Sequence, residues 1–183
     1  YIQLASAASK LAWQDAKLET DKINPLRAGV IISSGIGGIS TFENNMKTYM
    51  EKGPGRISPF FIPMMISNMA SGVVSIELGL KGMSFCVVSA CASSTHALGV
   101  AADAIRSGRA DIMVAGGSEA AMTPMAVGGF CSLHALSTRN DEPTKASRPF
   151  DKERDGFVMA EGAATVVLES LAHAKARGAP IYA

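Results

Sequence analysis

The amino-acid sequence predicts an α/β fold with a largely parallel sheet. Short apolar runs rich in Val, Ile and Ala alternate with longer apolar segments of helical period, the order expected of repeated strand–helix units. Hydrophobic residues make up 48% of the 183 residues, so the chain can bury a substantial core in one domain. Because the predicted helices are themselves so apolar, we also expect one helical layer to lie between two sheets.

The first half of the chain predicts three helices and two strands. Apolar residues recur at helical spacing near the N-terminus, and the run RAGVIISS before GIGG is typical of a strand that ends in a glycine turn. The segment EKGPGRISP indicates a Gly/Pro loop. The expected elements are a helix over 2–17, a strand over 27–34, a helix over 39–51, an apolar helix over 64–80 that ends near Gly82, and a strand over 84–90.

The second half predicts three more helices and two or three more strands. After residue 91, apolar residues recur in steps of three and one as far as Gly108, a candidate for the helix end. The one long polar stretch, 137–156, indicates a loop. The expected elements are a helix over 91–108, a strand over 111–117, a helix over 122–136, a strand over 162–170, a helix over 170–178 and the start of a strand at 180–183.

Composition excludes several classes of protein. A net charge of +1 gives no global reason to expect nucleic acid. Three cysteines without a CxxC pair indicate neither a disulfide scaffold nor a zinc site, and favour a reducing, cytoplasmic setting. Two stretches without charge, 57–76 and 82–102, are long enough to span a bilayer, but their Pro, Ser and Gly content favours burial inside a soluble protein. The chain has no signal peptide and no initiator Met, so we expect it to start inside a longer protein.

A cysteine stands where one predicted strand turns into a helix. The segment SFCVVSACASSTHALG changes at 89–91 from a β-branched run to small residues. At the first turn of a helix, unpaired N–H groups and the positive end of the dipole favour a thiolate and can hold an oxyanion. Small neighbours leave room for a substrate carbonyl. Position alone leaves two interpretations of Cys91 open, a small core residue and a nucleophile.

The remaining cysteines and histidines offer no obvious partner for Cys91. Cys86 lies within the predicted strand and Cys131 within the helical segment GGFCSLHAL, so we expect both in the core. A nucleophilic cysteine commonly needs a histidine base. His96 follows by five residues, a rotation of roughly 140° around a helix, so we do not expect it to be that base. His134, in an apolar helical pattern, and His173 have no motif around them.

The segment VSACASSTHALGVAADAIRSGRADIMVAGGSEA resembles the active-site segment of the β-ketoacyl-acyl carrier protein synthases. The resemblance covers nearly the whole chain, through SSGIGG, GPGRISPFFIP, GGF, LSTRND, ASRPFDKERDGFV and HAKARGAPIYA in the same order. It points to the type II elongating enzymes of bacterial fatty acid synthesis. It implies the layered αβαβα fold of the thiolase superfamily, of which residues 1–183 are mostly the N-terminal, nucleophile half, incomplete at both ends.

The resemblance implies an acyltransferase that performs a decarboxylative Claisen condensation. Cys91 of SACAS would accept an acyl chain from the phosphopantetheine arm of acyl carrier protein, and malonyl-acyl carrier protein would then elongate the chain by two carbons. No metal and no permanently bound cofactor are implied, and the partners are acyl carrier protein and a second copy of the chain. The family's two catalytic histidines belong to the other half of the fold, so we expect this chain alone to stop at the acyl-enzyme.

The same resemblance assigns roles to four further side chains. Ile36, Phe61 and Phe130 match positions along the family's acyl pocket, with Phe61 reaching across a dimer interface; the alternative for each is core packing. Arg56 matches a basic contact to the acidic carrier protein, although an exposed arginine is usually only a solvated charge. The charged segment FDKERDG is expected to be a structural loop of ion pairs.

The sequence departs from the family's pattern in places, and other interpretations stay open. His134 and Gly55 stand where the elongating enzymes often carry basic docking residues, and Ala160 replaces a frequent glycine. A polyketide ketosynthase shares the fold and the cysteine. A non-catalytic partner that shapes chain length and binds carrier protein would lack the nucleophile. A nucleotide-binding loop at SSGIGG does not fit, because no third glycine stands at position 40.

Overall fold

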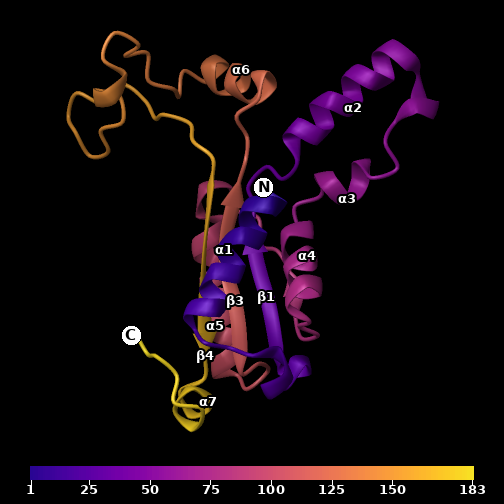
Figure 1. Cartoon of the computed structure of the whole chain (residues 1–183). Helices are drawn as coiled ribbons and strands as arrows, with labels where there is room; N and C mark the ends of the chain where they lie inside the picture. The colour runs from indigo at the N-terminus through magenta and orange to yellow at the C-terminus, as the bar shows by residue number, and fades with distance from the viewer.

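The computed structural model describes residues 1–183 and contains a four-stranded sheet with the strand order β2–β1–β3–β4 (Figure 1). The parallel strands are β1 (Ala28–Ser33), β2 (Ser84–Phe85) and β3 (Ile112–Glu119). The fourth strand, β4 (Gly162–Glu169), runs antiparallel to β3. The predicted α/β class is therefore confirmed.

The direction of β4 follows from where the chain travels between β3 and β4. The connecting segment leaves β3 at its carboxyl end, forms a helix and the long polar loop beyond that end of the sheet, and then descends beside β3 (Figure 1). Because the chain does not cross back over the sheet before it pairs again, β4 is antiparallel. Local periodicity alone carries no information on strand direction.

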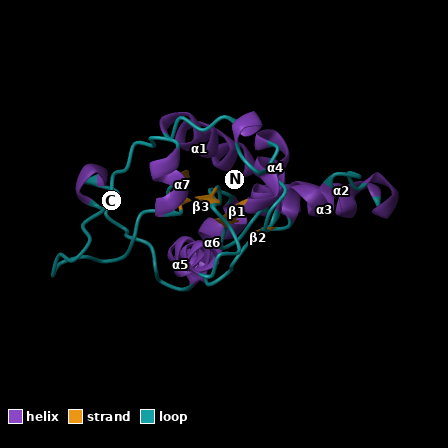
Figure 2. Cartoon of the chain, turned by 90° about the horizontal axis from the view of Figure 1, so that it is seen from below, coloured by secondary structure: helices purple, strands orange, loops and turns teal.

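Helices cover both faces of this sheet. On one side lie α1 (Ile2–Asp15) and α4 (Met69–Leu78), and on the other lies α5 (Ser93–Arg106) (Figure 2). Residues of β3 alternate between the two cores, so that Ile112 and Val114 pack with α1 and α4 whereas Met113 and Ala115 pack with α5. The expected second sheet is not formed by this chain, and the apolar helices instead cover a single sheet.

The remaining helices lie at the ends of the sheet. They are α2 (Ile39–Lys52), α3 (Phe61–Met65), α6 (Pro124–Ser132) and α7 (Leu171–Ala176). Two projections, α2 with α3 and α6 with the loop after it, extend past the carboxyl ends of β1 and β3, whereas α7 lies at the opposite end (Figure 1). The carboxyl end of the parallel strands is thus flanked by these two projections.

Several helix boundaries differ from the prediction. The apolar helix expected over 64–80 is two helices, α3 and α4, and α4 ends at Gly79 (φ +68°) rather than near Gly82. A residue with positive φ ends a helix at little cost when it is glycine. The helix expected over 122–136 stops at Ser132, so His134 lies outside it with φ +53°. Residues 180–183 form no strand.

The strand expected over 84–90 pairs over only two residues. Ser84 and Phe85 pair with β1, while residues 86–89 form no ladder, and the Val87 N–H donates to the Ser33 hydroxyl at 3.1 Å instead. Burial of the charge-free stretches is only partial: Ile76 is 79% exposed and Val88 is 55% exposed. None of the helices is both long and apolar enough to cross a membrane.

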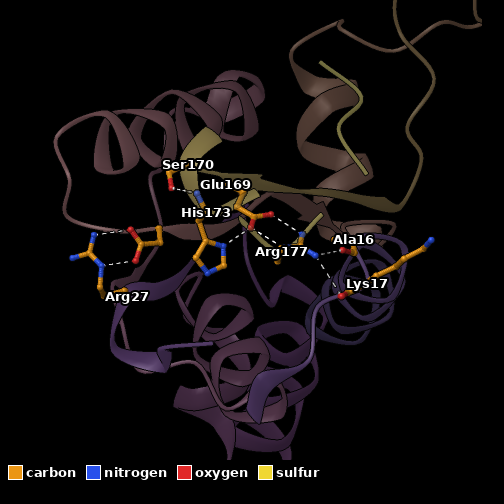
Figure 3. Close-up of polar contacts among 8 residues, drawn as sticks. Ala16, Lys17, Arg27, Glu169, Ser170, His173 and Arg177 are labelled. Carbon is orange, nitrogen blue, oxygen red and sulfur yellow. Dashed lines mark hydrogen bonds and ion pairs between the residues drawn. The ribbon is translucent and has the colours of Figure 1, made fainter. Parts of the chain in front are cut away.

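A network of ion pairs closes the amino ends of β1 and β3. Arg27 contacts Asp111 through Nε and Nη2 at 2.5 and 2.8 Å. Nearby, the nearly buried carboxylate of Glu169 accepts hydrogen bonds from Arg177 at 2.7 and 2.6 Å and pairs with His173 (Figure 3). Arg177 also donates to the carbonyl of Ala16, which joins α7 to the end of α1. Arg27, Asp111, Glu169, His173 and Arg177 thus form two groups of ion pairs at this end.

Candidate functional site

Cys91 lies in a short 3₁₀ turn, Ala90–Ala92, that leads into α5. Ala90 has a φ of +51°, an uncommon conformation for a residue with a side chain, so the chain bends sharply before the cysteine. The buried Ser93 hydroxyl stabilises this bend, since its Oγ donates to the Ala90 carbonyl at 2.6 Å and accepts from the Ser89 N–H at 2.8 Å. The turn therefore fixes the position of the thiol at the edge of the sheet.

The thiol of Cys91 is exposed, and it stands at the amino-terminal end of a 14-residue helix. Its backbone N–H donates no hydrogen bond within the chain. Such a group, together with the positive end of the α5 dipole, stabilises negative charge on the sulfur or on a nearby oxygen. The local chemistry suits a nucleophile and an oxyanion in the same place.

Two adjacent glycines of β3 let a side chain of α5 and the backbone of β4 approach this corner closely. A Cβ on Gly117 would lie 1.9 Å from Ser94 Oγ in the first turn of α5. A Cβ on Gly116 would lie 2.1 Å from the Ala164 carbonyl oxygen of β4. The glycine pair in AGGSEA is therefore required by the close approach of the first turn of α5 and of the neighbouring strand β4.

An open cavity of about 880 Å³ lies in front of the Cys91 thiol at the carboxyl ends of β1 and β3. Of its 24 lining residues, 14 are hydrophobic, so the cavity suits an apolar chain better than a charged ligand. The predicted residues Cys91, Ile36 and Phe130 all line it. Three positions that are far apart in the sequence are thus brought together around one space.

Phe157 is a further wall residue, and sequence reasoning did not single it out. Its ring meets Phe130 edge to face, with the centroids 5.2 Å apart. Both rings line the cavity. An aromatic residue directly after the charged segment DKERDG was the available signal, but the segment was considered only for its charges.

Phe61 and Arg56 lie away from this cavity. Phe61, at the start of α3, packs against Phe42 of α2 with ring centroids 6.4 Å apart. Arg56 is exposed in the turn Pro54–Arg56, just before α3. Within one chain, neither side chain contacts the thiol cavity.

The glycine turn after β1 is bound to a carboxylate at the end of β3. Glu119 Oε2 accepts from the N–H groups of Gly35 and Ile36 at 2.8 and 3.2 Å, and Oε1 accepts from Ser34 Oγ at 2.8 Å. The prediction missed Glu119 because it lies 84 residues from its partners. The carboxylate occupies the N–H groups of the turn, in keeping with the rejection of SSGIGG as a nucleotide loop.

No histidine forms a hydrogen bond with the Cys91 thiol. His96 Nδ1 pairs with Ser89 Oγ at 2.5 Å and makes no hydrogen bond to Cys91, in agreement with the geometric argument against a base at this position. His134 is exposed beyond α6, and His173 belongs to the ion-pair network at the opposite end of the sheet. The chain therefore supplies a nucleophile with no imidazole hydrogen-bonded to it.

The other two cysteines differ in their surroundings. Cys86 is half-buried, and burial raises the pKa of its thiol, which disfavours the thiolate. Cys131 is exposed, so its predicted place in the core is wrong. It lies near the carboxyl-terminal end of α6, where the helix dipole disfavours negative charge. Of the three thiols, only Cys91 combines exposure with a helix amino terminus.

The charged loop between α6 and β4 is held mainly by hydrogen bonds, and within the segment FDKERDG only Asp155 forms one of the predicted ion pairs, with Arg139. Asp155 Oδ1 accepts from Ser137 Oγ at 2.7 Å, and Oδ2 accepts from the Thr138 N–H at 3.1 Å. These hydrogen bonds, together with the charge of Arg139, lower the pKa of Asp155 below its ordinary value. Both carboxylate oxygens of Asp155 therefore accept hydrogen bonds that stabilise the loop, which leaves neither free to act as an acid or base.

Comparison with known proteins places this geometry in one family. The family described as "Beta-ketoacyl synthase, N-terminal domain" matches residues 1–174. The chain is 54% identical, over its full length, to the 3-oxoacyl-[acyl-carrier-protein] synthase 2 of Coxiella burnetii, and 51% identical to the chloroplastic synthase I of Arabidopsis thaliana. It spans 44% and 39% of those two proteins.

Solved structures agree with these sequence matches. A type II polyketide ketosynthase, bound to the hexaketide and in complex with its acyl carrier protein, superposes on the whole chain with a TM-score of 0.94 and 39% identity, the chain spanning 46% of it. A β-ketoacyl synthase from Burkholderia phymatum gives a TM-score of 0.88 and 41% identity, and the match covers 97% of this chain and 43% of that structure. The layered thiolase-like fold is therefore confirmed for the part of it that this chain represents.

Proposed function

Because the chain belongs to the β-ketoacyl synthase family, we propose that it is the nucleophile-bearing part of an elongating β-ketoacyl-acyl carrier protein synthase of fatty acid synthesis. One observation carries this proposal: an exposed thiol at a helix amino terminus, with a free backbone N–H, opens onto a mostly apolar cavity of about 880 Å³. A hydrocarbon chain and a thioester carbonyl are the groups that such a site accommodates.

In the first step, the Cys91 thiolate attacks the carbonyl carbon of an acyl thioester on carrier protein. A carbon–sulfur bond forms to Cys91 while the bond to the phosphopantetheine sulfur breaks, and the released thiolate takes up the proton that Cys91 gave up. The Cys91 N–H and the α5 dipole stabilise the oxyanion of the tetrahedral intermediate. The acyl chain then occupies the cavity beside Ile36 and Phe130.

In the second step, malonyl-acyl carrier protein loses carbon dioxide, and its carbanion attacks the acyl-enzyme carbonyl. The new carbon–carbon bond forms as the bond to Cys91 breaks, so the thiolate is regenerated and the chain is two carbons longer. Stabilising the developing enolate needs hydrogen-bond donors at the thioester oxygen. These 183 residues place no histidine there, so we assign that role to residues outside them.

Partners follow from the surfaces around the site. Acyl carrier protein delivers the substrate on its phosphopantetheine arm, with Arg56 as a docking contact, and no other cofactor is required. A second copy of the chain pairs along the edge next to β2, where residues 86–89 have no ladder partner, and brings Phe61 to the neighbouring cavity. The cytoplasm of a bacterium is the proposed location.

Two alternatives are distinguished by specific observations. A polyketide ketosynthase is favoured by the superposition on such an enzyme, but identity to it is 39%, against 54% to the Coxiella fatty acid synthase. A non-catalytic chain-length partner is disfavoured, because Cys91 is present and sits in a geometry suited to a nucleophile.

The complete enzyme that contains these residues, supplied with acyl- and malonyl-acyl carrier proteins, tests the proposal through the product. We expect a single β-ketoacyl thioester, two carbons longer than the starter, and no product from Cys91→Ala. The matched variant Cys131→Ala, which also removes an exposed thiol, should keep wild-type turnover. Repeated extension to poly-β-keto chains would favour the polyketide alternative, and turnover by Cys91→Ala would overturn the proposal.

A further inference from the structure

The carboxylate of Glu119 holds the turn formed by residues 34–37 through three hydrogen bonds that it accepts from the turn. Glu119 Oε2 accepts from Gly35 N at 2.8 Å and from Ile36 N at 3.2 Å. Oε1 accepts from Ser34 Oγ at 2.8 Å, and Ser34 Oγ in turn accepts from Gly37 N at 2.8 Å. Since the acceptor is charged, these bonds are stronger than those between neutral groups.

This turn lies between Glu119 and the turn that carries the thiol. A Cβ on Gly35 would lie 3.0 Å from Glu119 Oε2 and 3.4 Å from the carbonyl oxygen of Ala90. Ala90 directly precedes Cys91, and both residues line the cavity together with Glu119. A shift of the turn would therefore change the shape of the space directly beside the sulfur.

The same turn presents Ile36 to the cavity. Ile36 is 40% exposed and is one of the lining residues, while its own N–H is among the groups that Glu119 holds. Because Ile36 is this exposed, its side chain is not held in place by a surrounding core. Its position depends on the backbone of the turn, and the backbone depends on the carboxylate.

We propose that Glu119 is a positioning residue that sets the length of acyl chain accepted at Cys91, by fixing the Ile36 wall of the cavity. The inference rests on the proposed function, because it requires that Cys91 take an acyl chain. Glu119 itself exchanges no proton and touches no reacting atom. Both of its oxygens are occupied by the turn.

Glu119→Gln tests the proposal, because the amide NH₂ replaces one acceptor with a donor that faces backbone N–H groups. The purified protein is offered an equimolar mixture of short and long acyl thioesters, and the acyl groups on Cys91 are read by intact mass. Without these hydrogen bonds the turn can move, and the Ile36 side chain can shift to make room for longer acyl chains. We therefore expect the ratio of long-chain to short-chain acyl-enzyme to rise about tenfold over wild type.

Glu161→Gln is the matched control. Glu161 also accepts a backbone N–H, that of Met122 at 2.9 Å, but it neither lines the cavity nor touches the turn. It should keep the wild-type ratio. The rate at which iodoacetamide labels Cys91 should also stay within about twofold in Glu119→Gln, a change of less than about 0.5 kcal/mol in barrier, which separates a shifted wall from general loosening of the site.

A double-mutant cycle with Ile36→Ala tests whether the effect passes through that side chain. Ile36→Ala alone should raise the same ratio, and adding Glu119→Gln should change it no further. Fully additive effects would contradict the route through Ile36. If Glu119→Gln fails to fold, Ser34→Ala, which removes one bond to the carboxylate, should raise the ratio about threefold.

The outcomes separate this inference from the proposed function. Absence of acylation on the wild-type protein would overturn both. An acylated wild type with a clear length preference, beside a folded Glu119→Gln that keeps the same preference, would overturn this inference alone.

Discussion

The two ends of the sheet use charge in opposite ways. At the amino ends of β1 and β3, charged side chains neutralise one another, as in the pairs Arg27–Asp111 and Arg177–Glu169 (Figure 3). At the carboxyl ends, the carboxylate of Glu119 is held by backbone N–H groups and a hydroxyl instead of a cation. One end is closed by ion pairs, and the other opens into a mostly apolar cavity beside Cys91.

The difference shows how one small sheet separates stability from chemistry. At the amino end, Arg177 forms an ion pair with Glu169 of β4 and donates a hydrogen bond to the Ala16 carbonyl at the end of α1. At the carboxyl end, glycines and small side chains leave space around the thiol, and Cys91, whose backbone N–H is unpaired, lines that space. Ligand sites of α/β sheets lie beyond the carboxyl ends of parallel strands for the same reason.

The largest expected effect comes from Gly116→Ala, at the site end of the sheet. A Cβ there would lie 2.1 Å from a backbone carbonyl oxygen of β4, which cannot rotate away. We expect a loss of about 3 kcal/mol in the free energy of unfolding, together with slower labelling of Cys91. Urea denaturation measures the first and iodoacetamide kinetics the second.

Gly128→Ala serves as its control. No atom lies within 4 Å of a Cβ at this helical position in α6, so the change should be neutral or stabilise the protein by up to about 1 kcal/mol. A wild-type stability for Gly116→Ala would show that β3 and β4 are not packed as described.

Arg177→Ala should affect stability without affecting the site. It leaves the Glu169 carboxylate, only 8% exposed, without its main partner. Breaking a buried pair costs about 3–5 kcal/mol, and since Arg177 is itself partly exposed we expect about 2 kcal/mol. The labelling rate of Cys91 in Arg177→Ala should match wild type. The control is Lys175→Ala, at an exposed neighbouring position, which should keep both the wild-type stability and the wild-type labelling rate. A large fall in labelling would mean that the two ends are coupled.

Acid should weaken the amino end through Glu169. Burial by itself raises the pKa of this carboxyl, but hydrogen bonds from Arg177 and His173 outweigh burial and leave the pKa below its ordinary value of 4.5. The folded state therefore favours the ionised form. Its contribution to stability is complete above the unfolded pKa and is lost as pH falls through the lower folded pKa.

Urea titrations at about pH 7, pH 4.5 and pH 3 measure this dependence. Wild type should lose stability over the lower part of this range, and Glu169→Gln should show a shallower fall because it has no carboxyl to protonate. Equal slopes for the two proteins would contradict the assignment.

His96→Ala has the smallest expected effect. The imidazole bonds to Ser89 on the exposed side of the cysteine turn and does not contact the thiol. In the complete enzyme, condensation should stay within about tenfold of wild type, a change of about 1.4 kcal/mol in barrier. A loss as large as that of Cys91→Ala would make His96 the base and overturn the geometric argument against it.

Sequence alone predicted those features of the site that depend on local pattern. The cysteine at a strand–helix corner follows from a break in β-branched residues at 89–91, and the structure has the corner there. Ile36 and Phe130 were expected along one pocket only through family resemblance, and they do line one cavity. The order of helices and strands followed from periodicity.

The remaining features depend on contacts distant in sequence. Glu119 binds a turn 84 residues away, and no local pattern indicates that pairing. The strand at 84–90 was overestimated because its apolar residues reach past the two that find a partner in β1. Cys131 looked like a core residue in an apolar helical pattern, but α6 projects beyond the sheet and leaves the thiol exposed.

The most direct test of the account is the intact mass of the protein after incubation with an acyl thioester. We predict that wild type gains one acyl group, that Cys131→Ala gains the same group, and that Cys91→Ala gains none, with peptide mapping placing the adduct on Cys91. Acylation of Cys91→Ala to the wild-type extent, or an adduct mapped to Cys86 or Cys131, would contradict the assignment of the nucleophile.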